Sequence, residues 1–431
     1  MEFLESILLP PRADHVLIAK YIIIVISLFI VPYVSILFGS SLFALGFSVR
    51  EKIDRKPFFG QFGKDIAETF LGRMVVGFVM GILPIAIIAF CFALVLYGTG
   101  FKVTQYFGII LIQAVLMLIA SRMFRNSFEN RERGFLMHVV WGLATIGLAK
   151  VVIYGFVSVI TMIYFPEKWP YIDGPMPWTY DWSMAWKFVH FLVAALALTG
   201  AAIHFFFLNW EGGKEGLSSE YRDYVRKFGG GVALGLGILQ AVFLLLYVAT
   251  VPVMTKSYAF FFSAMLGVLV MLIASMYLLN ILRDRETRFG SHVFVLFLVF
   301  FLVLLINDNY ARESALHYQN YELAALAAQH ELEIETSRSE RGNAAEASVE
   351  VGKQIFDTKC IACHRFDQRI VGPPYNDVLP KYDGDLEKLS GFILNPVKVN
   401  ADYPAMPNQG LKPFEAESAA MYLMEEFKKN Q

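Results

Sequence analysis

The feature that most constrains the fold of this sequence is a series of long apolar runs with few charges. Most of them reach about 18 residues or more, the length that an α-helix needs to cross a bilayer. Hydrophobic residues make up 56% of the chain and charged residues only 17%, against roughly a quarter in soluble domains. The sequence therefore predicts an all-α, polytopic membrane helix bundle. We expect about eight transmembrane helices, at residues 18–48, 74–98, 104–121, 136–165, 184–208, 230–253, 259–282 and 291–306.

Basic residues are distributed unequally between the connections that join these runs. Most lie after the first, third, fifth and seventh runs, as do Arg50, Arg125 and Arg226, and few lie in the alternate connections. Because loops rich in lysine and arginine stay in the cytoplasm, we expect both termini on the outer side. The net charge is −1 and no basic block occurs, so nothing predicts binding to nucleic acid.

The composition changes after the last apolar run. Residues 1–306 form the expected transmembrane domain, which is surrounded by membrane lipid. Residues 307–335 are polar with apolar residues at helical spacing, and residues 336–349 have little to bury. We interpret 307–349 as a helical stalk followed by a flexible linker. Residues 350–431 are expected to form a separate soluble domain.

This last segment contains the pattern Cys-Ile-Ala-Cys-His, at Cys360, Cys363 and His364. The spacing is that of covalent c-type haem attachment, in which two thiols add to the vinyl groups of one haem and the histidine ligates its iron. Two other interpretations are a zinc half-site and a redox dithiol. Zinc requires a second pair of ligands, and no other cysteine lies in this segment. A dithiol does not require the histidine. The pattern therefore predicts one covalent haem c.

The residues around this motif resemble a class I monohaem cytochrome c over the whole C-terminal segment. The resemblance rests on a short helix before the motif, a Gly-Pro-Pro-Tyr sequence after it, a Tyr-Pro-Ala-Met-Pro loop and a final amphipathic helix. It implies that His364 and Met406 ligate the haem iron and that the Pro373 carbonyl orients His364. A methionine ligand raises the reduction potential and leaves no open coordination site, so we expect electron transfer. Met406 could otherwise be a residue of the core.

The same resemblance predicts the location of the chain. Haem c is attached on the outer face of the bacterial inner membrane. The distribution of basic residues independently places the C-terminus outside. We therefore expect a multi-pass protein of the bacterial inner (cytoplasmic) membrane with its C-terminal domain in the periplasm.

The membrane domain is similar to subunit I of cytochrome bd-type quinol oxidases. The similarity lies in Trp-Lys-Phe-Val-His, which ends at His190, and in a Met-Leu-Gly sequence that begins at Met265. It implies a haem b with its iron between His190 and Met265. An alternative is a two-haem cytochrome b using His190 and His204, although no other run has two matching histidines.

Other parts of the membrane domain depart from that family. The long quinol-binding loop is reduced to a short connection at residues 254–258, and the histidine and acidic residues expected for the oxygen-reducing haems are absent. Lys150 lies near the middle of an apolar run, where a charge is expensive unless it is paired. It could hold a haem propionate, a quinone oxygen or part of a proton path, or it could extend to the membrane surface.

These features together predict a membrane-bound respiratory electron-transfer cytochrome. Haem c, and a haem b if present, would pass electrons between a quinol-linked subunit and a soluble or membrane-bound redox partner in the periplasm. Other subunits of a respiratory complex, and a quinone, are expected partners. Two alternatives remain: the catalytic subunit of a divergent bd-like oxidase or quinol:cytochrome c reductase, and a structural anchor for cytochrome c in a supercomplex.

Overall fold

A computed structural model describes residues 11–430 except 132, 173, 178–180, 345 and 383–384, with side chains omitted at 338–344. The described residues are helical with irregular connections and contain no β-strand. They divide into two compact units, Met1–Ala327 and Ala328–Gln431. The predicted all-α class is therefore confirmed.

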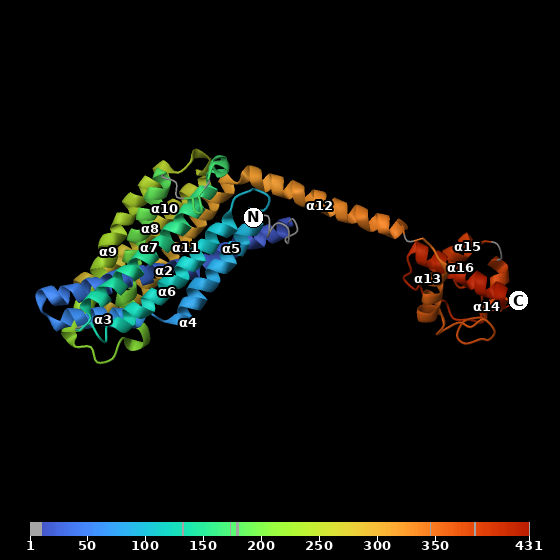
Figure 1. The fold of residues 1–431 in the computed structure, drawn as a ribbon, viewed down its shortest axis with the longest axis horizontal. Helices are drawn as coiled ribbons and strands as arrows, with labels where there is room; N and C mark the ends of the chain where they lie inside the picture. Colours follow the sequence, from blue (N-terminus) through green and yellow to red (C-terminus); the bar gives the residue numbers. More distant parts are fainter. Residues whose placement is uncertain are drawn as a thin grey trace. The chain divides into compact units, whose positions relative to one another are not determined.

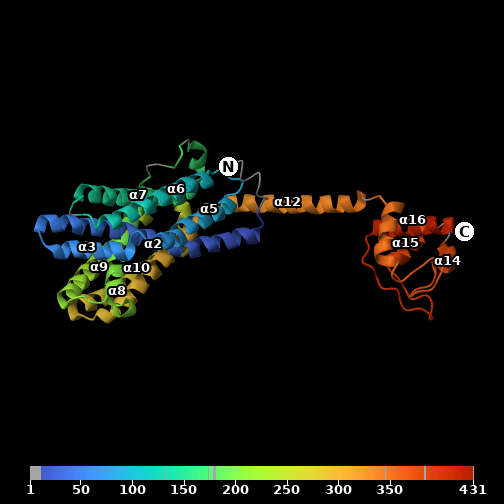
Figure 2. The same cartoon turned by 60° about the horizontal axis from the view of Figure 1, so that its bottom comes forward.

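Eight helical segments in the described residues are long and apolar enough to cross a membrane. They contain α2 (Ala13–Asp54), α4 (Met74–Gly77) with α5 (Leu83–Val95), α6 (Val103–Ser127), α7 (Phe135–Ile163), α8 (Trp182–Leu208), α9 (Ser219–Thr250), α10 (Tyr258–Asp284) and α11 (Gly290–Ala315). The helices lie lengthwise beside one another (Figures 1 and 2). The predicted number of spans is confirmed, although several boundaries differ.

Two boundary differences have clear physical causes. The helix α9 begins at Ser219 because Ser218 caps it, with the side chain of Ser218 accepting a hydrogen bond from the Tyr221 N–H. The helix α11 continues past the predicted end at 306 to Ala315. Its last two turns hold polar residues that are buried, namely Asn307 and Arg312, so these residues belong to the bundle and not to the stalk.

The helix α2 is central to this bundle and contacts α3 (Pro57–Phe70), α5, α7, α8 and α11. A close approach of two helices lies between α8 and α9 and depends on glycine. A Cβ atom on Gly200 would lie 2.8 Å from the carbonyl oxygen of Gly229, and a Cβ atom on Gly229 would lie 2.8 Å from the carbonyl oxygen of Gly200. Small residues that let two backbones approach are the usual packing device inside membranes.

Contacts between the basic connections support the prediction that successive spans cross the membrane in alternate directions. Arg131 forms an ion pair with Glu51 at 2.9 Å, and Arg226 donates to the carbonyl oxygens of Ile281 and Leu282 at 2.9 Å. Lys214 also forms an ion pair with Asp65 at 2.6 Å, which joins the fifth connection to the first. The connections that follow the first, third, fifth and seventh spans therefore lie at one end of the bundle. This is the end that the distribution of basic residues assigns to the cytoplasm.

The segment after α11 is helical for longer than predicted. The helix α12 runs from His317 to Ala344 and covers most of the region expected to be a flexible linker. Alanine, glutamate and arginine, which are strong helix formers, make up half of residues 336–349. The C-terminal unit then contains α13 (Val349–Ile355), α14 (Tyr375–Val378), α15 (Leu386–Leu394) and α16 (Pro413–Lys429).

Candidate functional site

The Cys-His motif is held by packing between α13 and α16. A Cβ atom on Gly352 would lie 2.0 Å from the backbone oxygen of Ser418, so only glycine allows this approach. The Ser348 N–H also donates to the Ser418 hydroxyl at 3.2 Å. The helix α13 then widens into a π-turn over Phe356–Cys360. This arrangement fixes where the first cysteine leaves the helix.

Backbone hydrogen bonds fold the motif into a compact turn. The N–H groups of Cys363 and His364 both donate to the carbonyl oxygen of Cys360, at 3.1 and 3.0 Å. The N–H groups of Val371 and Gly372 donate to the carbonyl oxygen of Cys363, at 3.3 and 2.9 Å. The two cysteines and the histidine are therefore presented by one short, hydrogen-bonded segment.

The ring of His364 is oriented by the Gly-Pro-Pro-Tyr segment. Its Nδ1 lies 3.1 Å from the carbonyl oxygen of Pro373, as expected from the sequence, and its ring stacks on Tyr375 with centroids 4.9 Å apart. A Cβ atom on Gly372 would lie 2.1 Å from the ring, so this position needs glycine. The Nδ1–H donates to Pro373, which leaves Nε2 free for a metal.

Burial also favours the neutral form of this histidine. Burial lowers the pKa of His364, and the hydrogen bond to the Pro373 carbonyl partly opposes this effect. Neutral imidazole is the form that ligates metals. Burial likewise raises the pKa of the Cys360 thiol.

Met406 lies, partly buried, in a loop without helical structure between α15 and α16. Three contacts hold this loop in place. Lys359 Nζ donates to the Gln409 carbonyl at 3.2 Å, Arg369 donates to the Asp402 carbonyl at 3.0 Å, and Arg369 also covers the Tyr403 ring at 4.4 Å. Because Lys359 and Arg369 flank the Cys-His motif, the loop that carries Met406 is attached to the motif from both sides.

These residues fit a haem c better than a zinc ion. The described residues contain no group of three or more histidine, cysteine, aspartate or glutamate side chains that could hold a metal, whereas structural zinc needs four such ligands. Haem c needs only the two thiols and one imidazole from the motif, with a second axial ligand from elsewhere. The free Nε2 of His364 and the loop of Met406 meet these needs.

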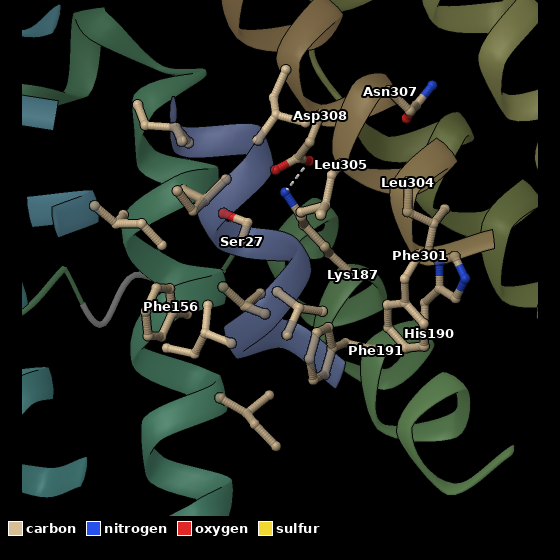
Figure 3. A pocket seen from close by; sticks show the side chains of 18 of the residues that line it. Ser27, Phe156, Lys187, His190, Phe191, Phe301, Leu304, Leu305, Asn307 and Asp308 are labelled. Carbon is tan, nitrogen blue, oxygen red and sulfur yellow. Dashed lines mark hydrogen bonds and ion pairs between the residues drawn. The ribbon is translucent and has the colours of Figure 1, made fainter. Parts of the chain in front are cut away.

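The membrane unit contains a cavity of about 150 Å³ that sequence reasoning missed. Residues of α2, α5, α7, α8, α9 and α11 line it, and most of them are apolar. At one end Lys187 forms an ion pair with Asp308 (Figure 3). The Lys187 ammonium also donates to the Tyr164 hydroxyl at 3.0 Å, and that hydroxyl bonds to Asp308.

The sequence held a partial signal for this cluster. Lys187 belongs to the Trp-Lys-Phe-Val-His segment that we used for His190, and Asp308 and Arg312 lie four positions apart. This spacing places Asp308 and Arg312 on one helix face, together with the apolar residues Ala311 and Ala315. The polar composition after residue 306 hid this face, because it also suited an exposed stalk.

The structure does not bring His190 and Met265 together. His190 is buried at 5% exposure, whereas the side chain of Met265 is 72% exposed. The ring nitrogens of His190 face away from Lys187 and Asp308 (Figure 3), and Gln240 lies beside the ring. No residue of α10 lines the cavity next to His190. A haem b between these two residues would require α10 to turn Met265 inward.

The other predicted membrane residues also lie apart from the cavity. His204 is buried against Gly290, whose Cβ would lie 2.4 Å from Nδ1 of the histidine. His138, on α7, contacts the Ser127 hydroxyl at 2.7 Å. Lys150 is exposed on α7 and does not line the cavity.

Comparisons with known proteins identify only the C-terminal unit. The model of the cytochrome c family matches residues 349–425. Cytochrome c-551 of Pseudomonas denitrificans is 34% identical over 77 residues, which cover 17% of this chain and 94% of that protein. No solved structure matches the chain. These matches do not extend to the membrane unit and give no support to its resemblance to bd-type oxidases.

Proposed function

Because the chain belongs, through its C-terminal domain, to the cytochrome c family, we propose that it is a membrane-anchored electron-transfer protein of the bacterial inner membrane. A cytochrome c domain implies a covalent haem c and a redox partner, and the eight apolar helical segments indicate a multi-pass membrane protein. The observation that carries the proposal is the orientation of His364 by Pro373, with Nε2 left free.

In this proposal Cys360 and Cys363 would bind the haem through thioethers, and His364 and Met406 would ligate its iron. When bound, the haem supplies a one-electron couple. Pro373 holds the His364 ring in one tautomer, and Lys359 and Arg369 fix the Met406 loop. The basic connections at the opposite end of the bundle from α12 support a periplasmic position for this domain.

The test is to measure haem by type in the purified full-length chain. We expect one covalently bound haem c per chain, reduced by ascorbate and reoxidised by an added soluble cytochrome c. Absence of covalent haem would contradict the proposal. A b-type band in the same spectrum would restore the haem b interpretation of His190, with a second ligand other than the exposed Met265.

Replacing Met406 by leucine should lower the reduction potential of the haem. Leucine has a similar volume but cannot ligate iron, and methionine ligation raises the potential. We expect a decrease on the order of 0.1 V, out of the roughly 0.8 V that axial ligation spans. Redox titration measures the decrease. Carbon monoxide should bind to the reduced haem of the variant and not to the reduced haem of the unaltered protein. Met424→Leu in the core of α16 is the control. An unchanged potential in Met406→Leu would exclude Met406 as a ligand.

Lys150 favours association of this chain with another membrane subunit. Its side chain is exposed near the middle of α7, where an unpaired charge costs about 2.5–3.5 kcal/mol on insertion scales. A partner helix with an acidic residue at this depth would neutralise it.

Replacing Lys150 by leucine should therefore act oppositely on the isolated chain and on the complex. We expect the isolated chain to become more stable in the membrane, and the amount of co-purified partner to fall severalfold. Quantitative mass spectrometry of the native membrane complex measures the second effect. Lys102→Leu, at the start of α6, is the control. Unchanged co-purification would exclude Lys150 as a partner contact.

A further inference from the structure

The cavity in the membrane unit has the size of one six-membered ring. Its volume is about 150 Å³, and a cavity of about this volume lined by apolar residues binds benzene in an engineered protein. Its long walls are apolar, with residues such as Ile23, Ile153 and Phe301. The cavity therefore favours a ligand whose head is a single ring.

One end of the cavity is polar and has an excess of positive charge. Lys187 and Asp308 form an ion pair and compensate each other. Arg312 adds a further positive charge and is only 3% exposed. Its side chain lies over the Phe92 ring at 5.2 Å, and one terminal nitrogen donates to the Asn309 side chain at 2.6 Å. No carboxylate among the described residues forms an ion pair with it within 4.0 Å.

Two buried donors at this end lack a partner. The Nε of Arg312 and the hydroxyl of Tyr247 make no hydrogen bond of normal geometry with any described residue, although Tyr247 lies beside Tyr164 and Asp308. Tyr247 is 4% exposed. A buried donor without an acceptor costs about 1–3 kcal/mol. The missing partner is thus a hydrogen-bond acceptor that enters the cavity.

These residues lie at the end of the bundle from which the chain continues to the C-terminal domain. Tyr247 is near the end of α9 and Asp308 near the end of α11, and α12 follows α11 directly. Lys187 lies near the start of α8. The polar end of the cavity is therefore on the side that the proposed topology assigns to the periplasm.

We propose that this cavity binds the ring of a quinone and that the corresponding quinol is the electron donor to the C-terminal haem. The inference rests on the proposed function and names its donor class. The quinone oxygens accept hydrogen bonds from Tyr247 and Arg312, and the ring lies between the apolar walls. On oxidation both O–H bonds of the quinol break, and two protons leave to water at this end. Its two electrons reduce ferric haem c in two successive one-electron steps, with reoxidation by the downstream acceptor between them.

The test follows reduction of haem c in the purified full-length chain by a short-chain benzoquinol, with rapid mixing. We expect saturable reduction. Tyr247→Phe should raise the half-saturating concentration about fivefold, as expected for one hydrogen bond, and should weaken equilibrium binding of the oxidised quinone by the same factor. Tyr106→Phe is the control, because Tyr106 is 1% exposed in α6 and does not line the cavity.

The outcomes separate this inference from the proposed function. Reduction by ascorbate without saturable reduction by quinol would overturn the quinol site and leave the electron-transfer proposal intact. Failure of both reductants would overturn both. If vesicles of phosphatidylglycerol displace the quinone, and Tyr247→Phe weakens lipid binding alone, the cavity is a lipid site and the inference is wrong. Equal effects of Tyr247→Phe and Tyr106→Phe would also overturn it.

Discussion

Replacing Cys360 and Cys363 together by serine is expected to abolish covalent haem attachment completely. The two thiols are presented by one turn, in which the Cys363 N–H donates to the Cys360 carbonyl, and each forms one thioether to the same haem. Haem staining of the denatured chain on a gel measures the attachment. The double variant should give no signal, and each single variant a reduced signal.

The third cysteine provides a matched control. Cys91 is buried in α5 within the membrane unit, and serine at this position should leave haem staining unchanged. A persistent signal in the double variant would mean that the haem is attached elsewhere. Loss of the signal in Cys91→Ser would mean that the loss reflects misfolding or poor insertion rather than thioether chemistry.

Replacing Lys187 by methionine is expected to destabilise the membrane unit by about 3 kcal/mol. The substitution removes one partner of a mostly buried ion pair and leaves Asp308 without its cation, which is the costly way to break such a pair. The Tyr164 hydroxyl would remain as a partner of Asp308 and limits the loss. Thermal unfolding in detergent measures the effect as a lower midpoint.

Adding Asp308→Asn to that variant should recover most of the lost stability. Asparagine keeps an acceptor for Tyr164 and removes the uncompensated charge. Lys20→Met is the control, because Lys20 pairs with Glu313 at 2.9 Å at a more exposed site and should change the stability by about 1 kcal/mol or less. If Lys187→Met and the double variant unfold alike, the pair contributes no coupling energy.

The local signals of this sequence were enough to predict the elements of the fold. Apolar runs of membrane length depend only on consecutive residues, and each of the eight predicted spans overlaps one of the eight long apolar helical segments of the structure. The hydrogen bond from His364 to Pro373 was expected from the resemblance to class I cytochromes c, and both residues belong to one short segment. Positions at the ends of spans were harder to predict, as the extension of α11 to Ala315 illustrates.

Predictions that required two distant segments to meet were less successful. His190 and Met265 were paired from short motifs that resemble those of bd-type oxidases. Such motifs do not specify which face of a helix turns inward, and the structure turns Met265 outward. Lys150 was considered as a contact of a haem propionate, a quinone oxygen or a proton path, and its side chain is exposed on α7. Rotation of each helix about its axis depends on packing with several neighbours.

The membrane class, the number of spans, the separate C-terminal domain and its haem-attachment motif could all be predicted from the amino-acid sequence. Each of these follows from hydrophobicity or spacing over a short stretch of chain. Only the tertiary structure placed Lys187, Tyr247 and Arg312 around one cavity, since they come from α8, α9 and α11. Their proximity depends on how these three helices pack. An unpaired charge is costly inside a membrane, so each helix turns the face that carries its charged residue toward a partner inside the bundle.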